Sequence, residues 1–69
     1  MIEVDARGLS CPEPVLLTNE ALNQAGDEPV LVIVSASVQR DNVKNRAEVH
    51  YKKTVEVEQK GKDYYLTIK

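Results

Sequence analysis

The residue best suited to covalent chemistry is Cys11, the only cysteine of this 69-residue chain. Pro12 and Pro14 follow it and favour the first turn of a helix, because that turn does not need their missing N–H groups. Free backbone N–H groups and the helix dipole stabilise a thiolate at such a position and lower its pKa. A thiolate held outward there could attack the sulfur of a partner's persulfide. Either Cys11 itself caps the helix, or Ser10 does so with Glu13 reaching back in a capping box.

The neighbours of Cys11 modify this expectation. Arg7 lies across the turn that begins at Gly8 and adds positive charge, whereas Glu13 opposes it, so we expect no extreme pKa for the thiol. The only histidine, His50, falls late in the second predicted helix, and nothing in the sequence places it near Cys11 as a dyad partner. The alternative is that Cys11 is a small buried hydrophobe, but the glycine turn and the flanking prolines favour an exposed position.

Composition excludes several classes of function. The net charge is −2 with no stripe of basic and aromatic residues, which disfavours strong nucleic-acid binding. The longest apolar run, Val30–Val34, has the length of a strand and not of a membrane span, and no signal-peptide pattern opens the chain. One cysteine allows no intrachain disulfide, and with one histidine it lacks the spaced ligand pairs of a zinc site. We therefore expect a cytoplasmic protein without a metal.

Apolar periodicity predicts one domain over residues 1–69 with two layers, helices packed against one face of a sheet. The expected order is strand, helix, strand, helix, strand, strand, over Ile2–Ala6, Pro12–Ala25, Val30–Val34, Val38–Tyr51, Thr54–Gln59 and Tyr64–Ile68. Val30–Val34 is apolar on both faces and should be an inner strand. Ser35–Ser37 is expected to form a loop, and the last two strands a hairpin. Of the adjacent Tyr64 and Tyr65, only one can face the core.

Helical spacing separates the residues expected in the core from those expected to contact partners. The first helix should bury a stripe of five residues: Leu17, Thr18, Ala21, Leu22 and Ala25. The second should bury Val43, Ala47 and either His50 or Tyr51. Leu16 falls outside the stripe, about one turn from Cys11, and we expect it to be an apolar docking anchor. A basic cluster on and after the second helix is either a solvated face or the charged rim of that docking surface: Arg40, Lys44, Arg46, Lys52 and Lys53.

The segment Val4-Asp-Ala-Arg-Gly-Leu-Ser-Cys-Pro-Glu-Pro-Val15 resembles the signature of the TusA/SirA-like sulfur carriers. The resemblance covers the whole chain, and the ending Asp63–Lys69 is most similar to the YedF-type branch, which is linked to selenium metabolism. It implies an α+β two-layer sandwich similar to the C-terminal domain of translation initiation factor 3. The implied sheet order is 1-2-4-3, with the last strand antiparallel.

The same resemblance implies a function and a set of site residues. Cys11 matches the cysteine that accepts sulfur from a cysteine desulfurase and relays it to an acceptor, for example towards tRNA thiolation. Asp5 and Arg7 match the charged pair of the signature, and the other expected supporting residues are Gly8, Pro12, Glu13 and Pro14. The chain departs from the family after the second strand, where Ser35-Ala36-Ser37 replaces the usual acidic or Asp-Asn residues. We expect this loop to face the cysteine end of the sheet, and its change leaves the partner's identity open.

Two hypotheses follow. In the first, the protein is a carrier-type sulfurtransferase, with a covalent persulfide on Cys11 as intermediate and no separate cofactor. Its partners would be a sulfur donor protein and a downstream acceptor protein, with no membrane involved, and the protein itself would be a monomer or a weak dimer. Selenium delivery is a variant that would use the same thiolate. In the second, the chain is a non-catalytic regulatory or binding module that retains the fold.

Overall fold

The computed structural model describes residues 1–10 and 13–69 and contains the predicted succession of helices and strands. The strands are β1 (Ile2–Asp5), β2 (Val30–Val34), β3 (Val55–Lys60) and β4 (Asp63–Ile68). The helices are α1 (Glu13–Ala25), α2 (Ser37–Asn45) and a π-helical continuation of it, η1 (Arg46–His50). Within these residues, no helix combines the length and the apolar character needed to cross a bilayer.

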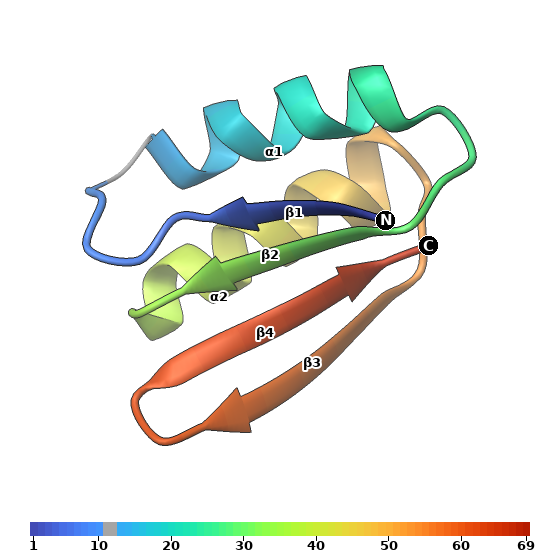
Figure 1. Ribbon diagram of the computed structural model, residues 1–69. Coiled ribbons are helices and arrows are strands. Elements are labelled where there is room, and N and C mark those ends of the chain that lie inside the picture. Colours follow the sequence, from blue (N-terminus) through green and yellow to red (C-terminus); the bar gives the residue numbers. More distant parts are fainter. Residues whose placement is uncertain (11–12) are drawn as a thin grey trace.

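The four strands form one sheet in the order β1-β2-β4-β3, which confirms the predicted α+β fold (Figure 1). β1 runs parallel to β2, while β4 is antiparallel to both β2 and β3. The register places apolar residues beside one another across the sheet, with Val4 next to Val32, Val32 next to Leu66 and Leu66 next to Val57. The inner position predicted for Val30–Val34 is therefore correct.

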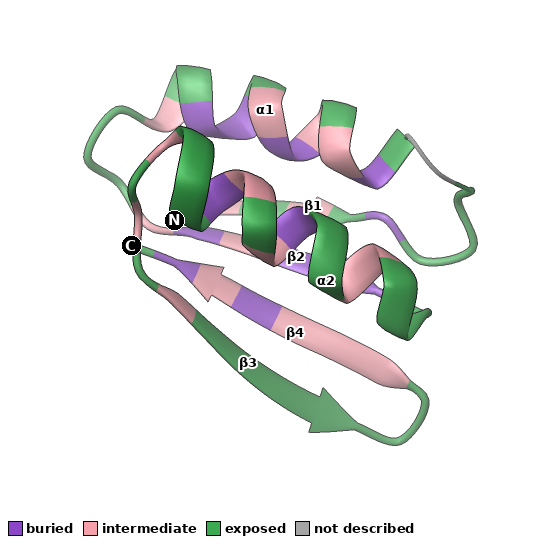
Figure 2. Ribbon diagram, turned by 180° about the vertical axis from the view of Figure 1, so that it is seen from behind, coloured by how far each residue is buried: buried purple, intermediate pink, exposed green. Residues whose placement is uncertain are grey.

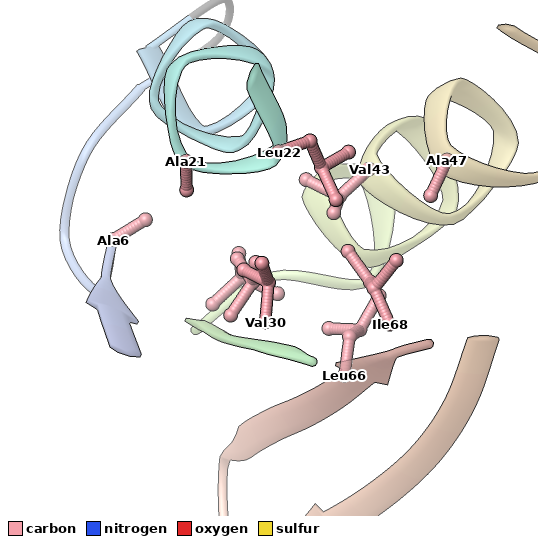
Figure 3. Packing of buried hydrophobic residues seen from close by; sticks show 10 residues of the cluster. Ala6, Ala21, Leu22, Val30, Val43, Ala47, Leu66 and Ile68 are labelled. Atoms are coloured by element: carbon pink, nitrogen blue, oxygen red, sulfur yellow. The ribbon is translucent and has the colours of Figure 1, made fainter. Parts of the chain in front are cut away.

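The core lies between the sheet and the two helices, which cover the same face of it (Figure 3). Val30, Val32 and Val34 of β2 are completely buried there, and Val43 of α2 packs into the same cluster. The core also contains five residues from the other elements: Ala21, Leu22, Ala47, Leu66 and Ile68. Colouring by burial shows the buried positions on the inner sides of α1 and α2, with exposed residues on their outer turns (Figure 2).

The inner face of α1 differs in part from the predicted stripe. Thr18, Ala21 and Leu22 are buried as expected, whereas Leu17 and Ala25 are only partly buried. The stripe continues towards the N-terminus through Pro14, which is completely buried and lies one helical turn before Thr18. Pro14 is therefore a core residue as well as a constraint on the turn after Cys11.

The second helix begins at Ser37, so Ser37 belongs to α2 and not to the preceding loop. Val43 and Ala47 point inward as predicted, and the alternative between His50 and Tyr51 is settled in favour of Tyr51. His50 is exposed, because the helix widens into the π-helical segment η1 before it ends. In β4, Tyr64 packs against the core and Tyr65 lies beside Ile33 on the opposite face.

Candidate functional site

The candidate site lies where β1 ends and the chain turns towards α1. Ala6 continues the pairing with β2 by donating its N–H to the carbonyl of Ile33 at 2.8 Å, and the loop Arg7–Ser10 follows. Cys11 and Pro12 lie outside the described residues. The predictions that the thiol is exposed, that Cys11 or Ser10 caps α1, and that Pro12 occupies its first turn therefore stay predictions.

The side chain of Arg7 links this loop to the end of β1 and to the start of β4. Its Nε and Nη2 atoms donate to the two carboxylate oxygens of Asp5 at 2.9 and 2.8 Å. This bidentate pair fixes the orientation of the guanidinium relative to the carboxylate. Its Nη1 atom lies 3.4 Å from Oδ2 of Asp63, at the start of β4. The backbone N–H of Arg7 also donates to Asp5 at 3.2 Å. We call these three residues, Asp5, Arg7 and Asp63, the arginine latch.

Pairing between Asp5 and Arg7 shifts the pKa of both groups. The hydrogen bonds from the Arg7 side chain, and then from its backbone, lower the pKa of Asp5 from 3.8 to about 2. The same bond to Asp5 raises the pKa of Arg7 further above its ordinary value. At neutral pH Asp5 is therefore ionised beside the Arg7 cation. Arg7 thus orients the loop before Cys11 as well as bringing charge to it.

Three further contacts hold the loop between Arg7 and Cys11. Gly8 adopts a φ of 77°, a left-handed conformation that favours glycine, and its N–H donates to Oγ of Ser35 at 3.1 Å. The amide of Gln39, on the first turn of α2, donates to the carbonyl of Leu9. The carbonyl of Ser10 accepts the N–H of Glu13 at 2.9 Å. The loop after β2 therefore lies beside the loop after β1, as the topology predicted.

On the C-terminal side of Cys11, the first turn of α1 is fixed by a buried proline. Glu13 is exposed at the first position of the helix, and the ring of Pro14 is buried beneath the first turn. The buried hydroxyl of Thr18 donates to the carbonyl of Pro14 at 2.7 Å, so the polar atom that Thr18 brings into the core is satisfied. The residues on both sides of the cysteine are thus fixed to the rest of the fold.

The residues predicted to contact partners do not form a single patch. Leu16 is 54% exposed on the outer side of α1. Arg46 lines a shallow groove of about 390 Å³ between α1 and the second helix, together with Val15 and His50. Arg40 lies elsewhere, with its guanidinium 4.8 Å from the centre of the Tyr64 ring and bonded to Asp41 at 2.9 Å. Lys44 is half-buried on α2.

Gln39 and Asp63 were not found from the sequence, and Ser35 was expected near the site only as part of its loop. Ser35 and Gln39 belong to the loop and helix that follow β2, and Asp63 begins the last strand. Their contacts depend on which strands lie side by side. No three histidine, aspartate or glutamate side chains of the described residues gather closely enough to hold a metal ion.

Comparison with known proteins shows which family this chain belongs to. The model of the family described as sulfurtransferase TusA matches residues 2–69. The chain belongs to the TusA sulfurtransferase family. Among solved structures, it is similar to a SirA-like protein from Desulfitobacterium hafniense, at 32% sequence identity and a TM-score of 0.91. That match covers 99% of this chain and 95% of the other. The family that the signature around Cys11 suggested is therefore confirmed, together with its fold.

Proposed function

We propose that this TusA-family protein is a sulfur carrier that accepts a persulfide sulfur on Cys11 and passes it to an acceptor. The observation that supports this most is the way the chain on either side of its only cysteine is held. The arginine latch, Ser35 and Gln39 fix the loop before it, and the buried Pro14 fixes the helix after it. A carrier needs such a support, because the sulfur must enter a partner's active site at a defined position.

The proposed transfer conserves electrons. The Cys11 thiolate attacks the outer sulfur of a persulfide on the donor, the donor's S–S bond breaks, and the donor cysteine leaves as a thiolate. Cys11 then bears the persulfide, and a nucleophile of the acceptor takes the outer sulfur in the same manner. The proposed donor is a cysteine desulfurase or another sulfur donor protein. Nothing but the sulfur is carried, so the step requires no further cofactor.

Mass spectrometry of the intact protein tests the proposal. After incubation with a cysteine desulfurase and cysteine, the protein should gain roughly 32 Da, the mass of one sulfur, and lose it again on reduction with a thiol. Because Cys11 is the only cysteine, Cys11→Ser is a complete control and should gain nothing. An adduct on the serine variant, or none on the unaltered protein with several desulfurases, would contradict the proposal.

The alternative, a non-catalytic binding module, predicts a different result from the same variant. Cys11→Ser would then still bind the partners of the unaltered protein and support its cellular function. For a carrier, Cys11→Ser should abolish transfer while changing the free energy of unfolding by less than about 1 kcal/mol, as expected for an exposed side chain. A large loss of stability would instead indicate that Cys11 is a core residue.

We also propose that the protein belongs to the YedF-type branch and acts in the cytoplasm, in sulfur or selenium metabolism. The similarity of the ending Asp63–Lys69 to that branch supports the assignment. Supplying the donor desulfurase with selenocysteine in place of cysteine tests the variant, because the selenium then reaches Cys11 from a donor S–Se bond that breaks in the same manner. A Cys11 adduct with the isotope pattern of selenium would support selenium delivery, and a sulfur adduct alone would favour tRNA thiolation or another sulfur pathway.

Partners of the carrier are proposed to dock around the start of α1, with Leu16 as an apolar anchor. The exposure of Leu16 supports this position, as does the groove beside Arg46 that opens on the same side of α1 as Val15. Rim charges such as Arg46 chiefly affect the association rate and its salt dependence. Arg46→Glu should therefore slow association at low salt and have little effect at high salt. Arg40 should contribute less, because it already pairs with Asp41 and lies over the ring of Tyr64. Lys44 should also contribute less.

A further inference from the structure

The outer edge of β1 has free hydrogen-bonding groups. Ile2 donates its N–H to Pro29 and Ala6 donates to Ile33, so the backbone groups of alternate residues, Ile2, Val4 and Ala6, face β2. The intervening residues, Glu3 and Asp5, must then direct their N–H and C=O groups away from the sheet. β1 is the first strand in the sheet order, and no other strand of the described residues pairs with it on that side (Figure 1). An extended chain could continue the sheet there.

A groove of about 290 Å³ runs along this free edge, between β1 and the side of α1. Ile2 and Val4 line it from the strand, and Leu17 and Ala21 line it from the helix. Ile2, Val4 and Leu17 are only partly buried. For Leu17, this is the departure from the predicted stripe of α1 described above. An added strand would cover these apolar side chains with every second residue, while its backbone met that of Glu3 and Asp5.

The charge of the groove indicates which chain would fit. Its lining residues include Glu3, Asp5, Glu20 and Gln24, and none of them is basic. The side chains of Glu3 and Asp5 alternate with those of Ile2 and Val4, so they lie on the opposite face of the strand, where every other residue of an added strand would point. Asp5 has its own cation in Arg7, whereas the lining brings no cation to Glu3 or Glu20. We propose that the edge of β1 binds an extended segment of a partner protein in which basic and apolar residues alternate. This surface is distinct from the one proposed for sulfur transfer, and the inference does not rest on Cys11.

Two other pairings fit the structure less well. A second copy of the chain, paired edge to edge through β1, would bring Glu3 and Asp5 of the two copies together, and like charges opposite one another destabilise a sheet. The other free edge, β3, has mixed charge from Glu56, Glu58 and Lys60, and it lines neither of the two grooves described above. The edge of β1 alone combines free backbone groups, an apolar floor and a single sign of charge.

A peptide titration followed by NMR tests the proposal on the Cys11→Ser protein, which excludes any thiol reaction. The probe is a peptide of alternating lysine and valine, capped at both ends and about six residues long, the usual length of a strand. It should shift the amide signals of Glu3 and Asp5 and slow their hydrogen exchange. The matched probe, with glutamate in place of lysine, should bind at least about tenfold more weakly because the groove is acidic.

Variants separate the backbone contact from the charge. Glu3→Pro removes an N–H that faces outward, which an edge strand tolerates, and should weaken binding of the lysine peptide about three- to tenfold, the effect of one hydrogen bond. Glu3→Gln keeps the donor and tests the charge, and Val57→Pro on the β3 edge should change nothing. Should Glu3→Pro prevent folding, Glu20→Lys, which leaves the strand intact, should weaken binding several-fold.

Four results would overturn the inference. They are peptide-induced shifts centred on β3, equal binding of the glutamate peptide, no binding at millimolar peptide, and sedimentation showing that the protein dimerises through β1. Absence of a sulfur adduct on the unaltered protein, together with normal binding of the lysine peptide, would contradict the proposed sulfur chemistry and leave the inference intact, so the two failures are distinguishable.

Discussion

Replacing Leu16 by alanine should weaken docking of a sulfur donor while leaving the fold intact. Complete burial of a leucine side chain contributes roughly 1.5–3 kcal/mol. The structure leaves Leu16 54% exposed, so about half of that, up to roughly 0.8–1.6 kcal/mol, is available to an interface. The dissociation constant should therefore rise about four- to fifteenfold. Stability should change little, because alanine has the highest helix propensity and compensates for the lost contacts.

The assay is the rate of persulfide formation on Cys11 at increasing concentrations of a cysteine desulfurase. Leu16→Ala should raise the concentration needed for half-maximal rate and leave the maximal rate nearly unchanged, because it alters binding and not the thiol. Leu16→Asp should have a larger effect, since docking would then bury a charge. The matched control is Val57→Ala, which removes an exposed apolar side chain from β3, the strand farthest from β1 in the sheet.

The reasoning fails if Leu16→Asp folds normally and transfers sulfur with unaltered concentration dependence. The docking surface would then lie elsewhere, and the open face of the sheet around Tyr65 would be the next candidate. An equal loss in Val57→Ala would also contradict it, because the effect would not be local to α1.

Three further predictions concern the latch and the core. If the arginine latch positions the loop, Arg7→Ala and Asp5→Asn should both slow persulfide formation, whereas a purely electrostatic role predicts opposite shifts of the thiol pKa in alkylation-rate profiles. The pKa of Asp5 is lowered in the folded state, so its contribution to stability is present above its ordinary value of 3.8 and is lost as the pH falls towards about 2. The urea concentration at the midpoint of unfolding should fall across that pH range in the unaltered protein and not in Asp5→Asn. The same pH dependence in both proteins would refute the pairing of Asp5 with Arg7. Val43→Ala should lower the free energy of unfolding by about 1–3 kcal/mol in urea at neutral pH, because Val43 is fully buried; a smaller loss would mean that the core relaxes around the cavity.

Local patterns predicted most of the fold. The alternation in Ile2–Ala6 and Tyr64–Ile68, and the two apolar faces of Val30–Val34, were enough to predict the strands and the inner position of β2. These signals work because each depends on side-chain direction within a few residues. The sheet order 1-2-4-3 came from the family resemblance, and no periodicity in the chain specifies it.

The support of the site could be predicted only in part. The turn at Gly8 and the positive charge of Arg7 follow from residue type and spacing, whereas the pairing of Arg7 with Asp5 was expected only from the family resemblance. Asp63 and Gln39 act on that turn only because β4 and α2 begin beside it, which depends on the three-dimensional arrangement. The burial of Pro14 could have been foreseen, since it lies one helical turn before Thr18. The widening of the helix at η1 has no comparable signal in the sequence.

The distances in sequence between the residues that hold the loop have a consequence for synthesis of the protein. The loop before Cys11 is made before the residues that hold it, because its contacts with Ser35, Gln39 and Asp63 span 27, 30 and 56 residues. Contacts of such long range form late, because the entropy of closing the intervening chain must be overcome first. On the ribosome the cysteine is therefore translated long before its surroundings can assemble. A nascent or truncated chain that lacks β4 would contain the thiol without the latch that fixes the loop beside it, so competence for sulfur transfer should arise only when the last strand joins the sheet.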